Sequence, residues 1–198
     1  MTARQLTDRG RERRRQLIDV ASRCFAERGY HPTSVTEIVN ELGVGKGVFY
    51  WYFDSKEELF LEILKGAQHD LRRRQQAAIA GLDDPLDQVA AGVRAAMEWA
   101  DQNRPLVSLV QFAATEELFA PAIRVGQAIA VDDALSYVDA ALDAGGGDAV
   151  DPDLMIHAML GVTFHLAQTY LLEGSRPVDE VADAAVRFCL TGLSGRPS

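Results

Sequence analysis

Two helix-start signals on either side of a glycine constrain this chain more than any other feature. Ser34 is followed three residues later by Glu37, which makes a capping box. Ser55 and Glu58 repeat the pattern, so a helix should begin at each serine. Gly43 lies between them, after an apolar stretch, where a helix end favours a residue that tolerates positive φ. The spacing predicts a short helix, a tight turn, a second short helix and a third helix start. This layout is typical of a helix-turn-helix, whose second helix enters the major groove of DNA.

The two short helices present different faces. The first has apolar residues at helical spacing, which predicts one buried stripe made of Val35, Ile38, Val39 and Leu42. The second, from about residue 46 to 53, is crowded with aromatics. Tyr50, Trp51 and Tyr52 cannot all be buried on so short a helix, and large aromatics in water indicate a partner. Phosphate accepts hydrogen bonds from tyrosine, tryptophan and lysine, and ring edges contact thymine methyls, so the partner we expect is DNA.

This segment therefore supplies the candidate DNA contacts. The strongest candidates are Lys46, Tyr50, Trp51 and Lys56. The hydroxyl groups of Ser34 and Thr36 would reach phosphate from the preceding helix. The complete set is Ser34, Thr36, Gly45, Lys46, Gly47, Val48, Tyr50, Trp51 and Lys56. The alternative is that the aromatics pack against a neighbouring domain and the lysines are only solvated.

The segment resembles the DNA-binding domain of the TetR family of bacterial transcriptional regulators. The matching residues are Gly29-Tyr30, Thr33-Ser34-Val35, Ile38, Gly43-Val44, Lys46-Gly47, Phe49-Tyr50, Tyr52-Phe53 and Ser55-Lys56-Glu57-Glu58-Leu59. They cover about the first quarter of the chain. Gly45 stands where the family often has Ser or Thr, and Val48 where it often has Thr, so two hydroxyls that could contact DNA are absent. The resemblance implies a dimeric, all-helical regulator whose ligand domain diverges widely in sequence.

The charge distribution removes an objection to DNA binding. The net charge is −9. Residues 1–56, however, hold ten Lys and Arg against seven Asp and Glu, a net of +3, while residues 57–198 hold ten against twenty-two, a net of −12. The basic N-terminal part can bind the phosphates of DNA, while the acidic remainder of the chain limits nonspecific binding. Basic residues near the start of the first helix could also touch the DNA backbone or could merely be solvated: Arg11, Arg13, Arg14 and Arg15.

The rest of the chain predicts helices, since no segment alternates like a half-buried strand. We expect an all-α protein with a three-helix DNA-binding domain containing the helix-turn-helix in residues 1–54. A six-helix ligand-binding and dimerisation domain would follow in residues 55–198. In the helix that links them, Arg72, Arg73 and Arg74 should be solvated.

The N-terminus and the cysteines indicate where the chain resides. The N-terminus is arginine-rich, with no apolar segment of signal length. Cys24 and Cys189 are expected to be buried thiols of a cytoplasmic protein, with a redox-sensing pair as the alternative.

The penultimate helix has no charged residue from Leu154 to Leu172. Two His, one Gln and two Thr within it disfavour a membrane span, so we expect no membrane association. A helix that is apolar on every side must be covered, and a symmetric partner is the simplest cover. A homodimer would also present two recognition helices to a palindromic operator in double-stranded DNA. The expected interface residues are His157, Gly161, His165, Gln168, Leu172, Val181, Ala185 and Phe188.

Apolar and aromatic residues of the middle helices are candidates for a small-molecule pocket. They are Met97, Trp99, Phe112, Thr115, Tyr137, Met159 and Thr163, with ordinary core packing as the alternative for each. No catalytic or cofactor-binding motif is visible. His157 and His165 are two turns apart, which does not suit a helical metal pair, so we expect no enzyme, no cofactor and no metal site.

These patterns predict a ligand-responsive transcriptional regulator. Its simplest form is a repressor that a small apolar or amphipathic molecule releases from its operator. The alternative is an all-helical carrier or enzyme body whose DNA-binding head is not functional.

Overall fold

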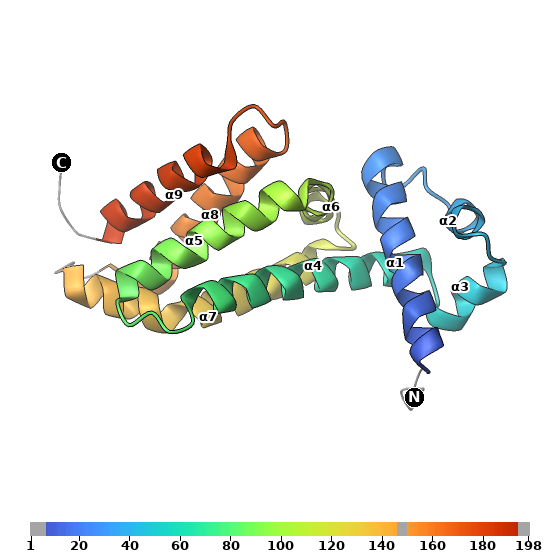
Figure 1. Cartoon of the computed structure of the whole chain (residues 1–198), viewed down its shortest axis with the longest axis horizontal. Coiled ribbons are helices and arrows are strands. Elements are labelled where there is room, and N and C mark those ends of the chain that lie inside the picture. The colour runs from blue at the N-terminus through green and yellow to red at the C-terminus, as the bar shows by residue number, and fades with distance from the viewer. Residues whose placement is uncertain (1–6, 146–149, 194–198) are drawn as a thin grey trace. The chain divides into compact units, whose positions relative to one another are not determined.

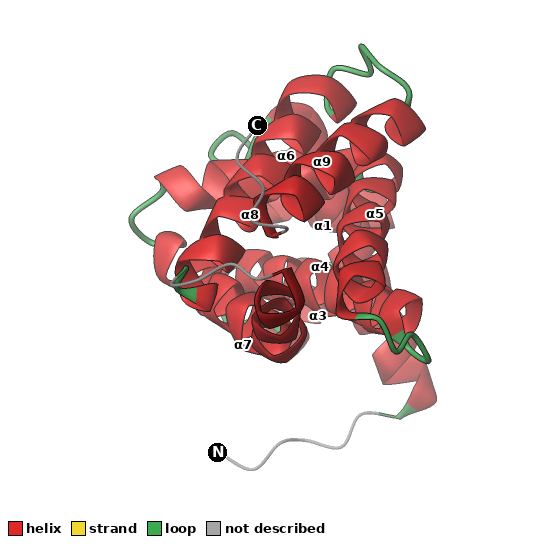
Figure 2. Ribbon diagram, turned by 90° about the vertical axis from the view of Figure 1, so that its left-hand side faces the viewer, coloured by secondary structure: helices red, strands yellow, loops and turns green. Residues whose placement is uncertain are grey.

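A computed structural model describes residues 7–145 and 150–193, and in these ranges every regular element is a helix (Figures 1 and 2). Nine α-helices follow one another in the described ranges, with one π-helical segment after the eighth. Their bounds are α1 (Asp8–Arg28), α2 (Val35–Leu42), α3 (Lys46–Tyr52), α4 (Lys56–Ile79), α5 (Pro85–Gln102), α6 (Arg104–Thr115), α7 (Ala120–Gly145), α8 (Pro152–Leu166), η1 (Ala167–Leu171) and α9 (Val178–Leu193). The all-α prediction is confirmed.

The chain forms two compact units, Met1–Gly66 and Ala67–Ser198. We refer to them as the head and the body. The head holds α1, α2 and α3, coloured blue to cyan in Figure 1, and the first turns of α4. Its limit lies inside α4 rather than at residue 54, because the start of α4 belongs to the head's core. The ring of Phe60 packs against those of Phe25 and Tyr30, with centroids 5.5 and 4.8 Å apart.

Local signals set the first helix of the head. The Thr7 hydroxyl accepts a hydrogen bond from the Gly10 amide at 3.2 Å, which caps α1 at its N-terminus. Gly29, at φ 87°, ends the helix. The residues that α1 buries share one face: Leu17, Val20, Ala21, Cys24 and Phe25.

The body forms a second core. Helix α5 packs against α7 and α9, and α7 packs against α8; Figure 2 views this bundle end-on. Asp84 and Asp151 cap α5 and α8, and each is followed by a proline in the first helical turn. Met97, Val138 and Ala185 are fully buried, so the three helices that carry them share one apolar interior.

We expected the arginines of α4 in the body to be solvated, but all three form ion pairs. Arg72 makes a two-pronged ion pair with Asp133 of α7. Arg73 and Arg74 pair with Asp70 on their own helix. The same carboxylate accepts a hydrogen bond from the indole nitrogen of Trp99 on α5 at 2.9 Å. Exposed pairs stabilise by under about 1 kcal/mol each, and the contacts of Arg72 with Asp133 and of Asp70 with Trp99 join α4 to α7 and α5.

The uncharged stretch that begins at Leu154 is not one regular helix. It changes from α-helical to π-helical hydrogen bonding at Ala167, and after it the chain turns at Gly174, where φ is 64°. In the part of the chain that the structure describes, no single helix is long and apolar enough to cross a bilayer. Helices α6 and α7 meet that test only as a pair bent by 114°.

Candidate nucleic-acid interface

The turn between α2 and α3 forms as its sequence predicts. The Ser34 hydroxyl accepts from the Glu37 amide at 3.2 Å, and the Glu37 carboxylate accepts from the Ser34 amide at 2.7 Å. Gly43 ends α2 in the left-handed conformation, at φ 72°. The Val44 amide then donates to the Val39 carbonyl at 2.9 Å, so the chain reverses tightly. The two short helices thus have the geometry of a helix-turn-helix.

Helix α3 divides its aromatics between the head's core and solvent. Phe49 is fully buried, and its ring packs against that of Phe53, which follows the helix, at a centroid distance of 5.8 Å. Tyr50 and Trp51 are each 55% exposed, although they neighbour Phe49 in sequence. The core-facing pair fixes the helix, and its other face presents two large rings to solvent, as the sequence predicted.

The remaining candidate DNA contacts lie at the surface around these rings. Ser34 and Thr36 are exposed at the start of α2. Gly45, Lys46 and Gly47 are exposed at the start of α3, and Val48 is half-buried. A Cβ atom at Gly45 or Gly47 would meet nothing within 4 Å, so both backbones are open to an approaching molecule. Serine, threonine and lysine side chains together with open backbone amides are the groups that position a protein on phosphates.

Lys56 lies differently from the other candidates. Its Nζ atom donates to the Tyr30 carbonyl and to the Thr33 carbonyl, both at 3.0 Å. It also lies 4.2 Å from the centroid of the Tyr30 ring. The ammonium is therefore engaged inside the head. The local sequence around Lys56 does not predict these contacts, because Lys56 and Tyr30 are 26 positions apart in the chain.

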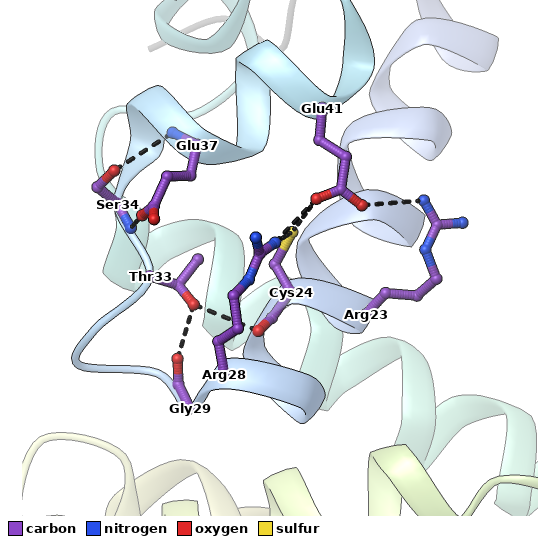
Figure 3. A network of polar contacts seen from close by, with 8 residues as sticks. All are labelled: Arg23, Cys24, Arg28, Gly29, Thr33, Ser34, Glu37 and Glu41. Atoms are coloured by element: carbon purple, nitrogen blue, oxygen red, sulfur yellow. Dashed lines mark hydrogen bonds and ion pairs between the residues drawn. The ribbon is translucent and has the colours of Figure 1, made fainter.

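A polar network joins the end of α1 to α2 (Figure 3). Glu41 on α2 accepts from Arg28 Nη2 at 2.8 Å and from the thiol of Cys24 at 3.3 Å. Arg23 lies 3.5 Å from the same carboxylate. The hydrogen bond from Arg28 is the main reason that the pKa of Glu41 falls below its ordinary value. Burial, and then the hydrogen bond to Glu41, raise the pKa of Cys24, so the reactive thiolate form is disfavoured.

The basic cluster near the start of α1 is largely paired. Arg11 and Arg15 form ion pairs with Asp8 and Glu12 on the same helix. Arg14 pairs with Glu62 and lies over the ring of Phe53. Arg14 therefore joins α1 to the first turns of α4 within the head.

The candidate pocket residues separate into two groups. Met97, Trp99, Tyr137 and Met159 belong to one apolar cluster in the body, and of these Met97 and Trp99 are buried. Burial raises the pKa of the Tyr137 hydroxyl, and the negative charge of Asp133 adds to the effect.

The other pocket candidates are not part of that cluster. Phe112 packs against Phe119 instead, at a centroid distance of 6.4 Å. Thr115 and Thr163 each use the hydroxyl to bond a carbonyl of their own helix, those of Phe112 and Met159.

The residues of the expected dimer face differ in their exposure, and two of them are buried by their own chain. His157, Gly161 and His165 are exposed on α8, while Gln168 and Leu172 are half-buried. Phe188 on α9 is 60% exposed. Val181 and Ala185, in contrast, are 3% and 0% exposed within the single chain, because α9 packs this face on α5. These two residues belong to the monomer's core, so they are not available to a partner.

The described residues place no group of three or more His, Cys, Asp or Glu side chains where they could hold a metal ion. Both cysteines are buried free thiols, one in the head and one in the body. The exposed candidate contacts at the start of α2 and on α3 are aromatic, cationic and hydroxylic, which suits phosphates and base edges.

Comparison with known proteins agrees with this geometry. Residues 17–63 match the model of bacterial regulatory proteins of the tetR family. The chain is 28% identical over 190 residues to the HTH-type transcriptional activator FasR of Mycolicibacterium smegmatis, covering 94% of this chain and 85% of FasR.

Solved structures extend the agreement to the whole fold. A TetR-family regulator from Syntrophomonas wolfei superposes with a TM-score of 0.82 at 19% identity, covering 94% of this chain and 97% of that one. AibR, solved in complex with isovaleryl coenzyme A and operator DNA, gives a TM-score of 0.74 at 21% identity and covers 89% and 97%. The shared fold thus includes both the head and the body.

Proposed function

Because the chain belongs to the TetR family of bacterial regulators, we propose that it binds a palindromic operator as a homodimer and leaves it when a small molecule binds the body. Family membership makes it a helix-turn-helix regulator of transcription and not an enzyme. The observation that carries the proposal is the exposure of Tyr50 and Trp51 on a helix that is anchored by the buried ring of Phe49. A fixed helix with two large solvent-facing rings suits insertion into a groove.

The candidate contacts of the head have different roles in the proposed complex. Lys46, Tyr50 and Trp51 would meet the DNA from α3, with Val48 touching a base edge. Ser34 and Thr36 would bond phosphate from the N-terminus of α2, where the helix dipole favours an anion. Gly45 and Gly47 would let the backbone of α3 approach the DNA closely. Lys56 is set apart, because its ammonium already bonds two carbonyls.

The dimer would form through the exposed apolar surface of α8 and α9. Leu154, Phe164 and Phe188 are 66%, 40% and 60% exposed there, and burial of such large apolar side chains would favour association. His157, Gly161, His165, Gln168 and Leu172 would complete the contact. Two-fold symmetry would place two α3 helices on half-sites about 34 Å apart or a multiple of that.

The effector would be apolar or amphipathic. Met97, Trp99, Tyr137 and Met159 belong to the body's apolar cluster, and such adaptable and aromatic side chains would favour an apolar group. Phe112, Thr115 and Thr163 would contribute from α6 and α8. AibR was solved with an acyl coenzyme A, and an acyl chain of that kind has the expected chemistry.

The proposed switch is a population shift. Helix α4 contributes to both the head and the body. An effector that repacks α5 and α7 would change how α4 lies on them, and so the spacing of the two heads. Repression is the simplest output, because a dimer on its operator excludes polymerase without further contacts.

The test uses footprinting on the DNA upstream of the protein's own coding sequence. The wild-type chain should protect a pseudo-palindrome, and a cell extract containing the effector should abolish protection. The variant with both Tyr50→Ala and Trp51→Ala should melt like the wild type but protect nothing. Equal protection by both proteins would contradict the proposed interface. In-vitro transcription on the same DNA then separates repression from activation.

A further inference from the structure

We infer that α3 recognises thymine by its methyl group and that Val48 is the residue that determines this specificity. The inference rests on the proposed function, because it names the base that the proposed interface reads. It begins from the composition of α3, which has none of the side chains Arg, Asn, Gln, Asp and Glu. The residues of the helix are Lys46, Gly47, Val48, Phe49, Tyr50, Trp51 and Tyr52.

This composition limits how α3 can distinguish base pairs by hydrogen bonds. In the major groove, Arg or Lys reads guanine, Asn or Gln reads adenine, and Glu or Asp reads cytosine. Only Lys46 belongs to these types, so guanine is the base that α3 can read through such a side chain. Thymine offers a different signal, because its C5 methyl group is recognised by apolar contact.

Val48 is the aliphatic side chain that α3 can offer to this methyl group. It is the third residue of the helix, and the N-terminal residues of a recognition helix contact base edges. Its amide donates to the Gly45 carbonyl at 2.9 Å, and the next residue, Phe49, is fully buried, so the backbone at Val48 is fixed. A β-branched side chain in a helix has one strongly preferred rotamer, so its methyl groups would meet the groove with little further loss of freedom.

The surface around Val48 lets a groove approach it. Gly47 is exposed, and a Cβ atom there would meet nothing within 4 Å, so the first turn of α3 is open. Trp51 lies one turn after Gly47 on the same face and is 55% exposed. Val48 is half-buried beside that face. Part of its surface therefore remains to cover a thymine methyl, and this contact would remove apolar surface of both partners from water.

The experiment begins by selecting duplexes that the full-length wild-type chain binds from a pool of random DNA. Each thymine of the selected half-site is then replaced singly by deoxyuridine, which removes only the methyl group. At least one replacement should weaken binding by roughly fourfold, the effect of losing the burial of one methyl-sized group. The slope of log affinity against log salt should stay the same, because no phosphate contact is lost.

Variants of the protein then identify the partner of that methyl group. Val48→Ala should bind the thymine and deoxyuridine duplexes with affinities within about twofold of each other, because the apolar contact is gone from both. Val48→Thr keeps the shape of the side chain but exchanges one methyl for a hydroxyl, so the deoxyuridine penalty should fall to about twofold. Tyr50→Phe is the matched control: it loses a hydroxyl but keeps its apolar surface, and the penalty should stay at roughly fourfold whatever its overall affinity.

The outcomes separate this inference from the proposed function. A selected half-site in which no deoxyuridine weakens binding, or which contains no thymine, overturns the inference and leaves the proposed function intact. A penalty that stays at fourfold in Val48→Ala, or in Val48→Thr should the alanine variant fail to fold, assigns the methyl contact to another residue and also overturns it. If the wild-type chain selects no duplex at all, the proposed function fails and the inference fails with it.

Discussion

The Glu41 carboxylate on α2 accepts a hydrogen bond from Arg28 at the end of α1, 2.8 Å away, and so ties the two helices that frame the loop. That bond, with a smaller contribution from Cys24, lowers the pKa of Glu41 from its ordinary value of 4.5. The ion pair is partly exposed, since 41% and 37% of the two side chains are accessible. It therefore acts more on the geometry of the head than on its total stability.

This pairing makes the head sensitive to acid. A carboxylate with a lowered folded pKa stabilises the fold above its unfolded pKa, near 4.5, and the stabilisation is lost as the pH falls through the lower folded value. The protection factors of the α2 amides, which correct for the intrinsic pH dependence of exchange, should therefore fall below about pH 4.5 in the wild type. Glu41→Gln should have lower protection factors at neutral pH, and they should depend less on pH. Glu27→Gln, an exposed site on α1, is the control and should behave as the wild type does.

Trp51 should report DNA binding directly. It is 55% exposed in the free protein, so burial in a groove should change its fluorescence. With Trp99→Phe to silence the body's tryptophan, titration with operator DNA should shift the emission to the blue. Trp51→Ala should weaken binding by about 1–3 kcal/mol while leaving the melting temperature unaltered. Emission that stays constant at saturating DNA would contradict contact at this residue.

Sequence patterns predicted the features of this fold that are local. The capping box at Ser34 and the left-handed turn at Gly43 are set by residues within a few positions of each other, and both are observed. The exposure of Tyr50 and Trp51 could also be predicted locally. A seven-residue helix has only one inner face, which cannot hold all of its aromatic side chains.

Contacts between distant segments were not predictable in the same way. The bonds from Lys56 to the 30–33 loop and from Arg72 to Asp133 depend on how helices meet, and an exposed lysine or arginine has the same local sequence signature in either case. The burial of Val181 and Ala185 within their own chain depends on such distant contacts too. Periodicity shows that a helix face is apolar, but not whether its own chain or a partner covers it.

Gly43 should tolerate no side chain without cost. Its φ of 72° is unfavourable for other residues, although a Cβ atom there would meet nothing within 4 Å. Gly43→Ala should therefore destabilise the head by about 1 kcal/mol through backbone strain alone. Gly66→Ala is the control of opposite sign: it lies inside α4, also with open space, and should stabilise by about 0.5–1 kcal/mol. Chemical denaturation of both variants measures the difference.

Cys189 should react only when the body unfolds. It is 1% exposed, and burial raises its pKa from an ordinary 9.0 to about 11. The thiolate is the reactive form, so alkylation at pH 8 should be far slower in the native protein than in denaturant. A raised thiol pKa contributes stability that is present below pH 9 and is lost as the pH rises towards about 11. Fast alkylation of the native chain would show that α9 opens readily from the body.

Phe188 and Ala185 distinguish the proposed dimer surface of α9 from the face that its own chain covers. It lies on α9 close to Ala185, yet it is 60% exposed while Ala185 is fully buried. Phe188→Glu would place charges in the proposed two-fold contact and should convert the dimer to monomers in sedimentation, with the monomer's fold intact. Leu118→Glu is the matched control, since Leu118 is 61% exposed but lies outside α8 and α9. Ala185→Leu should instead lower the stability of each chain by about 1–3 kcal/mol through overpacking against α5. Dissociation caused by Leu118→Glu but not by Phe188→Glu would move the dimer interface away from α9.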